Sequence, residues 1–360
     1  MGELSALDLA AALGHEEVIV LNDREAGLQG VIAIHDSTFG PGVGGTRMRV
    51  YPSFDAAVTD ALRLSRAMTY KATMVEMPYG GAKGVIVGDP GRDKTRAVLM
   101  TYAKAVDRLG GRFFTGCDMG IEPRDLMVMR RHTKHLSHAN EDSPVDTSYL
   151  AGLGVFEGIA AAAAILGREL RGLIVAIQGV GAVGYQVARL LAEHGAHVVV
   201  ADPDPGRTRR ANLMLEAQVV EPEAIYDVDA DVFSPNATGG ILNDDTIPRL
   251  KAHAVVGGAN EQLLEPRHGE ALHARNILWA PDYVVNAGGL LSLLYETKQA
   301  DEAGVEERVR LIGPRLADIW HRANEEDTTP GVVADRIVEE RLALGKRAKT
   351  ESMRRTKYED

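Results

Sequence analysis

Cysteine is almost absent from this 360-residue chain, which contains only Cys117. A single thiol excludes an intrachain disulfide and a metal site built from several thiolates, and it is typical of a reducing compartment. Positive charge is also scarce, because 40 basic residues face 51 acidic ones for a net charge of −11. This balance argues against nucleic acid or an anionic membrane as the main partner.

Long apolar runs are scarce as well. The longest candidate, residues 160–166, is far shorter than the ~20 residues that span a bilayer. Residues 1–11 carry acidic side chains and lack the basic segment that opens a secretory signal. We therefore expect a cytoplasmic protein. We expect no metal site.

The remaining composition is that of a globular protein with about two domains. Hydrophobic residues make up 45% of the chain and charged residues 25%. Residues 1–143 mix strand-like and helix-like stretches, and a polar segment at 138–144 predicts a linker. A glycine-rich segment at 40–45 separates two predicted strands, and the glycine-rich segment at 79–84 reads as a turn. Predicted strands lie at 17–21, 30–35, 46–51, 85–87 and 112–115, and predicted helices lie at 53–69, 96–109 and 123–135.

Residues 144–329 show a repeated strand–helix–strand pattern. This alternation predicts an α/β domain with a doubly wound parallel sheet, beside an N-terminal α/β domain. A bent helix is expected at 305–324, because Pro314 lies within it, and residues 346–360 read as a frayed end. The other predicted strands are 173–178, 197–201, 231–234, 254–256 and 277–279, and the other helices are 154–166, 183–194, 290–297 and 332–344.

The strand at 173–178 leads into a G-x-G-x-x-G motif, residues 179–184, which opens a helix. Asp202 ends the next strand, roughly 20 residues further on, as in dinucleotide-binding folds. The helix N-terminus suits a pyrophosphate, and Asp202 suits the ribose hydroxyls of NAD. Arg207, Arg209 and Arg210 leave NADP open, and a packing turn is the plainer alternative. The predicted cofactor contacts are Gly179, Val180, Gly181, Ala182, Val183, Gly184, Asp202, Pro203, Ala237, Asn260 and Asn286.

Three charged residues of the first half are candidates for chemistry. Lys71 follows the first long helix, Lys83 lies among glycines, and Asp118 follows a strand. A lysine in a closed apolar cleft can act as a base near neutrality, a second lysine can hold a carboxylate, and an aspartate can relay a proton. The residues alone equally permit two surface lysines and an aspartate that caps a helix.

Several longer motifs occur in order along the chain, and together they are far more specific than any one alone. With the dinucleotide motif, they make residues 14–296 strongly resemble the leucine/phenylalanine/valine dehydrogenase branch of the glutamate dehydrogenase superfamily. The motifs are Gly40-Pro-Gly-Val-Gly-Gly-Thr-Arg-Met48, Met68-Thr-Tyr-Lys-Ala72, Pro78-Tyr-Gly-Gly-Ala-Lys-Gly84, Thr115-Gly-Cys-Asp-Met-Gly120 and Pro281-Asp-Tyr-Val-Val-Asn-Ala-Gly-Gly289.

The resemblance implies reversible NAD-dependent oxidative deamination of an L-amino acid to a 2-oxo acid and ammonia. Lys71 would bind the substrate carboxylate, Lys83 would activate water, and Asp118 would relay protons. The two domains would close around the substrate, and a C-terminal helix at about 330–350 would return to the first domain. The resemblance also implies a homo-oligomer, either a dimer or an octamer.

The positions that match the family's substrate pocket are small or apolar, which argues against glutamate as the substrate. Selection among leucine, valine and phenylalanine cannot be read from them, since one methylene is worth only about 1–3 kcal/mol. An ordinary apolar core is the plainer alternative. The predicted substrate contacts, besides Lys71, are Val43, Gly44, Gly45, Met68, Gly116, Glu261, Leu290 and Leu293.

Two residues depart from the family pattern. Ala151 occupies a position where a threonine is usual, and Glu261 replaces the second asparagine of an Ala-Asn-Asn motif. A glutamate near the substrate carboxylate is costly unless it pairs with a cation, so Glu261 either pairs, turns outward, or selects an unusual substrate. The departures leave two alternatives: a silent NAD-binding paralogue, or a dehydrogenase of a non-standard amino acid.

Overall fold

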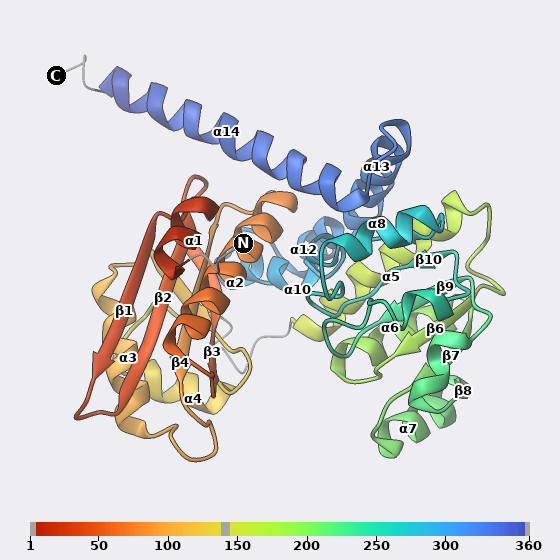
Figure 1. Ribbon diagram of the computed structural model, residues 1–360, viewed down its shortest axis with the longest axis horizontal. Helices are drawn as coiled ribbons and strands as arrows, with labels where there is room; N and C mark the ends of the chain where they lie inside the picture. The colour runs from red at the N-terminus through yellow and green to blue at the C-terminus, as the bar shows by residue number, and fades with distance from the viewer. Residues whose placement is uncertain (1–4, 138–144, 357–360) are drawn as a thin grey trace. The chain divides into compact units, whose positions relative to one another are not determined.

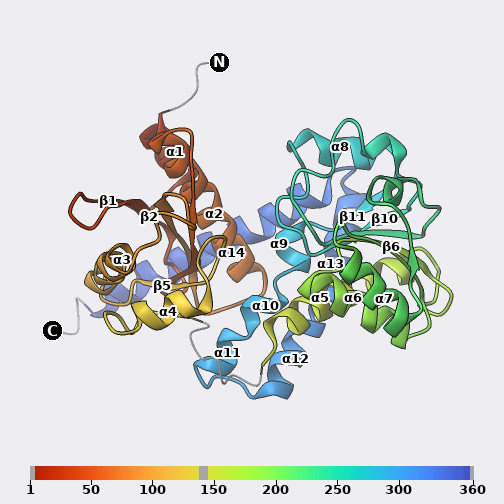
Figure 2. The same ribbon diagram turned by 90° about the horizontal axis from the view of Figure 1, so that it is seen from below.

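The computed structural model describes residues 5–137 and 145–356, and the segment for which a linker was predicted lies outside them. The chain separates into two compact units (Figures 1 and 2). The first unit contains residues 1–143 and 338–360, and the second contains residues 144–337. Each unit is described on its own below.

The first unit is built on a mixed sheet with the strand order β1-β2-β4-β3-β5. β2 is antiparallel to both β1 and β4, whereas β3 is parallel to both β4 and β5. The elements are α1 (Ala6–Leu13), β1 (Glu17–Asp23), β2 (Leu28–Asp36), β3 (Gly42–Arg49), α2 (Phe54–Met74), β4 (Gly80–Val87), α3 (Arg96–Arg108), β5 (Phe113–Gly116) and α4 (Pro123–Met129).

Side-chain alternation along the strands gives this sheet two covered faces. Ala57, Ala61 and Leu62 of α2 pack on one face, against Val31 and Val85. The opposite face packs on α3 and α4, through side chains such as Ile32, Ile86 and Tyr102. Because neighbouring residues of a strand point to opposite faces, β4 directs Lys83, like Val85, to the α2 side.

Both glycine-rich segments enter strands, which corrects the sequence prediction of a turn at 79–84 and of a connecting segment at 40–45. Gly42, Gly44 and Gly80 lie within β3 and β4, in close contact with neighbouring backbone. A Cβ on Gly44 would lie 1.8 Å from the Ala82 carbonyl oxygen, and one on Gly80 would lie 1.9 Å from that of Asp36. Glycine is required here for close packing rather than for a turn.

The second unit contains a fully parallel sheet with the strand order β11-β10-β9-β6-β7-β8, which confirms the doubly wound fold. Its strands are β6 (Ile174–Gln178), β7 (His197–Ala201), β8 (Gln218–Val219), β9 (Val232–Pro235), β10 (Ala254–Val255) and β11 (Leu278–Trp279). Its helices up to β11 are α5 (Thr147–Ile165), α6 (Ala182–Glu193), α7 (Pro205–Leu215) and α8 (Arg267–Ala274), with 3₁₀ turns at Pro222–Asp227 and Ile247–Arg249.

α5 is a 19-residue helix that is long and apolar enough to cross a membrane. It is longer than the apolar run at 160–166 that the sequence offered as the longest candidate. More than half of its apolar window is buried inside the protein, including Leu153, Ile159 and Ala162. It packs on α6, α10 and α13. We therefore interpret α5 as a core helix.

The C-terminal region is helical, with breaks that the sequence located only in part. The bent helix expected at 305–324 is two helices that meet at Leu311, and Pro314 lies in the first turn of the second, where a missing N–H costs nothing. The end expected to fray is helical to Thr356. The helices are α9 (Asp282–Val285), α10 (Gly288–Leu291), α11 (Leu293–Glu296), α12 (Glu302–Arg310), α13 (Ile312–Glu325) and α14 (Pro330–Thr356).

Candidate functional site

Lys83 and Asp118 form a buried ion pair in the first unit. Lys83 extends from β4 on the α2 side, and its side chain is only 7% exposed. Its Nζ donates a hydrogen bond to Oδ2 of Asp118, which lies just after β5. Asp118 is not a helix cap, because Glu122 caps α4. The structure thus brings together the two residues for which the sequence predicted chemistry.

The surroundings of this pair shift both proton affinities downward. Burial disfavours the ammonium form and lowers the pKa of Lys83, against the opposing effect of the Asp118 charge. Burial alone would raise the pKa of Asp118, but the positive charges of Lys83 and Arg47 outweigh it and hold that pKa below its usual value. A lysine that loses its proton more readily beside a lasting carboxylate is suited to general-base chemistry.

Glycines pack closely beside this pair. Gly45 and Gly116 are register partners on β3 and β5, and a Cβ on Gly45 would lie 2.9 Å from Cβ of Asp118. A Cβ on Gly44 would lie 3.4 Å from Cγ of Met68 on α2, so these two predicted pocket residues also meet. Val43 is buried in β3 with an exposure of 2%.

Lys71 and Cys117 complete the predicted residues of this region. Lys71 lies in the last turn of α2 and is half-buried. Cys117 is exposed. Partial desolvation and the nearby carboxylates of Asp125 and Glu122 raise the pKa of its thiol to about 11, which makes it a poor nucleophile.

In the second unit, the G-x-G-x-x-G segment forms the turn between β6 and α6. Gly179 has a φ of 85°, and a Cβ on it would lie 2.7 Å from Cβ of Ala237. Gly184 packs directly on the Gly179 carbonyl, where a Cβ would lie at 2.0 Å. Gly181 is the N-cap of α6 and has no capping side chain, which leaves the helix N-terminus open to an anion. This cradle fits a dinucleotide pyrophosphate.

Asp202 lies at the end of β7, as the motif requires, with its side chain 3% exposed. Its carboxylate accepts hydrogen bonds from the backbone N–H groups of Val180 and Asp204, each at 2.9 Å. Arg207 is the basic residue that approaches it, at 3.6 Å. A Cβ on Gly181 would lie 3.7 Å from the same guanidinium, so Arg207 lies next to the phosphate turn. The adjoining Pro203 is exposed.

Asparagines gather at the carboxyl ends of β9, β10 and β11. Nδ2 of Asn286 donates to Oδ1 of Asn260 at 2.8 Å and to the Gly258 carbonyl at 3.2 Å. Among the described residues, none hydrogen-bonds Oδ1 of Asn286, although this atom is buried. An unpartnered buried acceptor in this position fits the amide N–H of a nicotinamide.

Glu261, one of the departures from the family pattern, follows Asn260 with a φ of 50°. Its side chain is exposed, and no described cation forms an ion pair with it. Ala151 lies on α5 beside Gly288, which packs tightly on the Leu150 carbonyl. The predicted pocket residues Leu290 and Leu293 lie on α10 and α11, half-buried and buried respectively.

Sequence reasoning missed a group of charged residues on the α2 side of the first sheet. Arg47, on β3, bonds to Asp118 and to Asp60 of α2, and Asp60 in turn accepts from the Tyr51 hydroxyl. Strand alternation could have indicated Arg47, because it places this residue on the same face of the sheet as the predicted pocket residue Gly45. The partner Asp60, on a helix, had no such signal.

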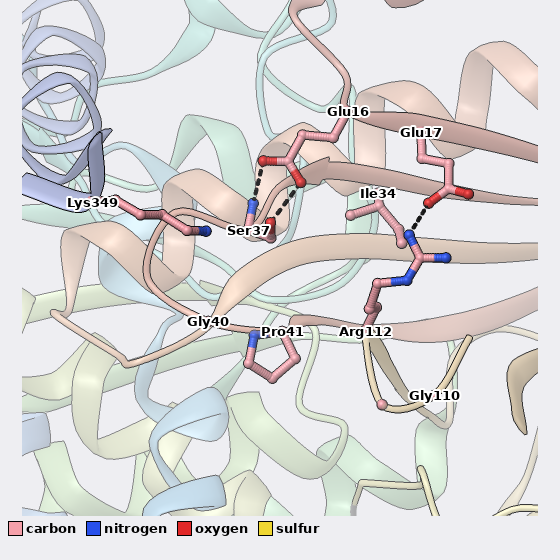
Figure 3. Close-up of a pocket in the computed structure, with 10 residues that line it drawn as sticks. Glu16, Glu17, Ile34, Ser37, Gly40, Pro41, Gly110, Arg112 and Lys349 are labelled. Carbon is pink, nitrogen blue, oxygen red and sulfur yellow. Dashed lines mark hydrogen bonds and ion pairs between the residues drawn. The ribbon is translucent and has the colours of Figure 1, made fainter. Parts of the chain in front are cut away.

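A separate pocket of about 480 Å³ also lies in the first unit (Figure 3). Glu16 accepts hydrogen bonds from Ser37 beside it, and Glu17 pairs with Arg112, while Lys349 of α14 extends toward it. It contains none of the residues predicted to be catalytic or to bind substrate or cofactor. This pocket is therefore separate from the pair formed by Lys83 and Asp118.

Comparisons with known proteins agree with this arrangement. Residues 15–135 match the profile of the "Glu/Leu/Phe/Val dehydrogenase, dimerisation domain", and residues 206–339 match "Glutamate/Leucine/Phenylalanine/Valine dehydrogenase". Residues 132–256 match "D-isomer specific 2-hydroxyacid dehydrogenase, NAD binding domain".

Curated relatives match along almost the whole chain. A phenylalanine dehydrogenase of Thermoactinomyces intermedius is 43% identical over 91% of this chain and 92% of its own length. A leucine dehydrogenase of Geobacillus stearothermophilus is 38% identical over 93% of each chain. The crystal structure of L-tryptophan dehydrogenase from Nostoc punctiforme superposes with a TM-score of 0.83 at 39% identity, covering 94% of this chain and 99% of that one.

Proposed function

The chain belongs to the Glu/Leu/Phe/Val dehydrogenase family, and we propose that it catalyses the reversible oxidative deamination of an apolar L-amino acid to its 2-oxo acid and ammonia. It is an oxidoreductase that uses NAD. The observation that carries the residue assignment is the buried Lys83, bonded to Asp118 and with a lowered pKa.

We assign the steps of the reaction to residues of the first unit. Lys71 holds the substrate carboxylate as a point charge. Lys83, in its neutral form, removes a proton from the water that attacks the substrate imine, and Asp118 carries protons to and from the substrate nitrogen. NAD, when bound, supplies the hydride acceptor. The residues around Gly179, with Asp202, Asn260 and Asn286, would hold it.

The side-chain pocket is assigned to small and apolar residues. No basic residue occupies a predicted position of the side-chain pocket, so a second substrate carboxylate has no partner there. This composition supports an apolar substrate. The residues assigned to this role are Val43, Gly44, Gly45, Met68 and Gly116 in the first unit and Leu290 and Leu293 in the second, whereas the exposed Glu261 is not assigned to it.

The wider organisation follows from the same family. We propose that residues 1–143 form the substrate and oligomerisation domain, with α14 returning to it, and that residues 144–329 form the NAD domain. The matching dimerisation profile supports a homo-oligomer, either a dimer or an octamer. A single cysteine and a buried α5 support a cytoplasmic location.

Replacing Lys83 tests the proposed chemistry. In Lys83→Ala, kcat for amino-acid-dependent NADH formation should fall by a factor on the order of 10² to 10⁴, because the general base is lost. NAD binding, measured by calorimetry, should be unchanged. Lys104→Ala, which removes an exposed lysine from α3, serves as the matched control and should keep full activity. Near-normal turnover in Lys83→Ala would contradict the assignment.

A further inference from the structure

The carboxylate that pairs with Lys83 is held by a second cation. Nε of Arg47 donates to Oδ2 of Asp118 at 3.1 Å, the same oxygen that accepts from Lys83. The other end of the guanidinium donates through Nη1 to Oδ2 of Asp60 at 3.1 Å. Arg47 therefore bridges two carboxylates, one from α2 and one from the turn after β5.

Asp60, which accepts the other end of the Arg47 guanidinium, is itself held in place. The Tyr51 hydroxyl donates to Oδ2 of Asp60 at 2.5 Å, and Asp60 belongs to the long helix α2. The side chain of Arg47 is only 14% exposed, so its charge is poorly screened by water. A planar guanidinium held at both ends has one orientation, which a flexible lysine ammonium cannot reproduce.

We propose that Arg47 is a positioning residue for the proposed dehydrogenase reaction: it fixes the Asp118 carboxylate against Lys83 and, balanced by Asp60, sets the charge around that base. This inference rests on the proposed function. It adds to Lys83 and Asp118 two further residues, on β3 and α2, that act through this pair rather than on the substrate.

The charges around Lys83 predict opposite effects for the two ends of the bridge. Burial is the largest cause of its lowered pKa, and the Asp118 charge opposes it. Arg47, from β3, lowers the pKa further, whereas Asp60, from α2, raises it. Tyr51 interacts electrostatically with Arg47 and Asp60. The lysine that α2 itself contributes is Lys71.

The pH dependence of kcat/KM for amino-acid oxidation tests the proposal, because its acidic limb reports deprotonation of the base in the free enzyme. In Arg47→Gln that limb should move to higher pH by about 0.5–1.5 units, from the loss of one nearby positive charge. In Asp60→Asn, an isosteric change, it should move to lower pH by about 0.5 unit. Arg47→Lys should restore most of the pH profile, yet kcat should stay about tenfold low, since lysine cannot bridge both carboxylates.

A second measurement reads Lys83 without any turnover. Lysine residues labelled with ¹³C at Cε are followed by NMR across pH, and the Lys83 signal is assigned from its absence in Lys83→Ala. Its midpoint should rise in Arg47→Gln and fall in Asp60→Asn. Shifts in the same direction, or no shift in either variant, would overturn the proposal. A wild-type protein that forms no NADH would instead contradict the proposed function, and the titration separates the two failures.

Discussion

At the scale of single residues, Glu261 adopts a backbone conformation that glutamate disfavours. Its φ of 50° lies in the left-handed region, which asparagine and glycine tolerate better than other residues. Backbone bonds hold it there, because its N–H donates to Asp282 and its carbonyl accepts from Gly240 at 2.8 Å. The conformation is imposed by the loop, and the side chain gains no described ion pair in return.

Glu261→Asn should therefore raise the free energy of unfolding by about 0.5–1 kcal/mol, because asparagine fits this conformation. Thermal unfolding measures the change, and Glu261→Ala, which lacks that preference, should show no gain. A melting temperature below that of the wild type would contradict the backbone argument.

Glu261→Asn also tests whether the Glu261 side chain lies in the substrate site. Unchanged kinetics with simple aliphatic amino acids would place the Glu261 carboxylate outside the substrate site. A change in KM of tenfold or more would place it at the substrate carboxylate. The exposed side chain leads us to expect the first result.

At the scale of elements, the second half of α14 packs on the first unit and closes the C-terminus of α2. Nη1 of Arg341 donates to the carbonyls of Thr73 and Met74, each at 3.1 Å, and its Nη2 lies 3.0 Å from Glu76. These are the last carbonyls of α2, which have no partner within the helix. A cation at this end also complements the helix dipole.

Arg341→Ala should lower the free energy of unfolding by about 1–2 kcal/mol, because the buried Met74 carbonyl loses its donor and the Thr73 carbonyl keeps only the backbone donors of the helix end. Urea unfolding followed by circular dichroism measures the loss. Arg322→Ala removes a half-exposed pair with Asp318 and serves as the control, with an expected loss below about 0.5 kcal/mol. Equal losses in the two variants would contradict the capping role.

Most elements could be predicted from the sequence, and the exceptions share a physical cause. The helix predicted at 53–69 begins where α2 does, and the Ser53 hydroxyl caps it by accepting from the Ala56 N–H at 3.1 Å. The strands β3 and β4 were cut short because glycine favours turns in isolation, whereas here it allows backbone packing, as at Gly44 and Ala82. α7 was missed because a mostly exposed helix lacks an apolar period. The short helix α8 was missed as well, although it buries Leu272.

The candidate site could be predicted only in part. Lys83 and Asp118 were identified through motif resemblance, and the structure shows that they bond. The contribution of Arg47 depends on Asp60, which belongs to a different element, so no local pattern could reveal it. Long-range pairing of this kind is specified by the fold rather than by sequence spacing.

At the scale of the whole molecule, the chain combines two units with separate tasks. The first contains the Lys83–Asp118 pair, and the second contains the dinucleotide turn at Gly179. In the proposed mechanism, oxidative deamination by NAD requires both units, because the first would supply the proton chemistry and the second would hold the hydride acceptor. The family relationship extends over both, with matches at 15–135 and 206–339.

The most direct test of this account is hydride transfer from the substrate. Wild-type protein is incubated at alkaline pH with NAD and with L-leucine, L-valine, L-phenylalanine or L-tryptophan, each carrying deuterium at Cα. We predict that at least one of them gives deuterated NADH, detected by mass spectrometry, with equimolar ammonia and 2-oxo acid. NADH without deuterium would contradict the account, as would no NADH from any of the four while NAD still binds.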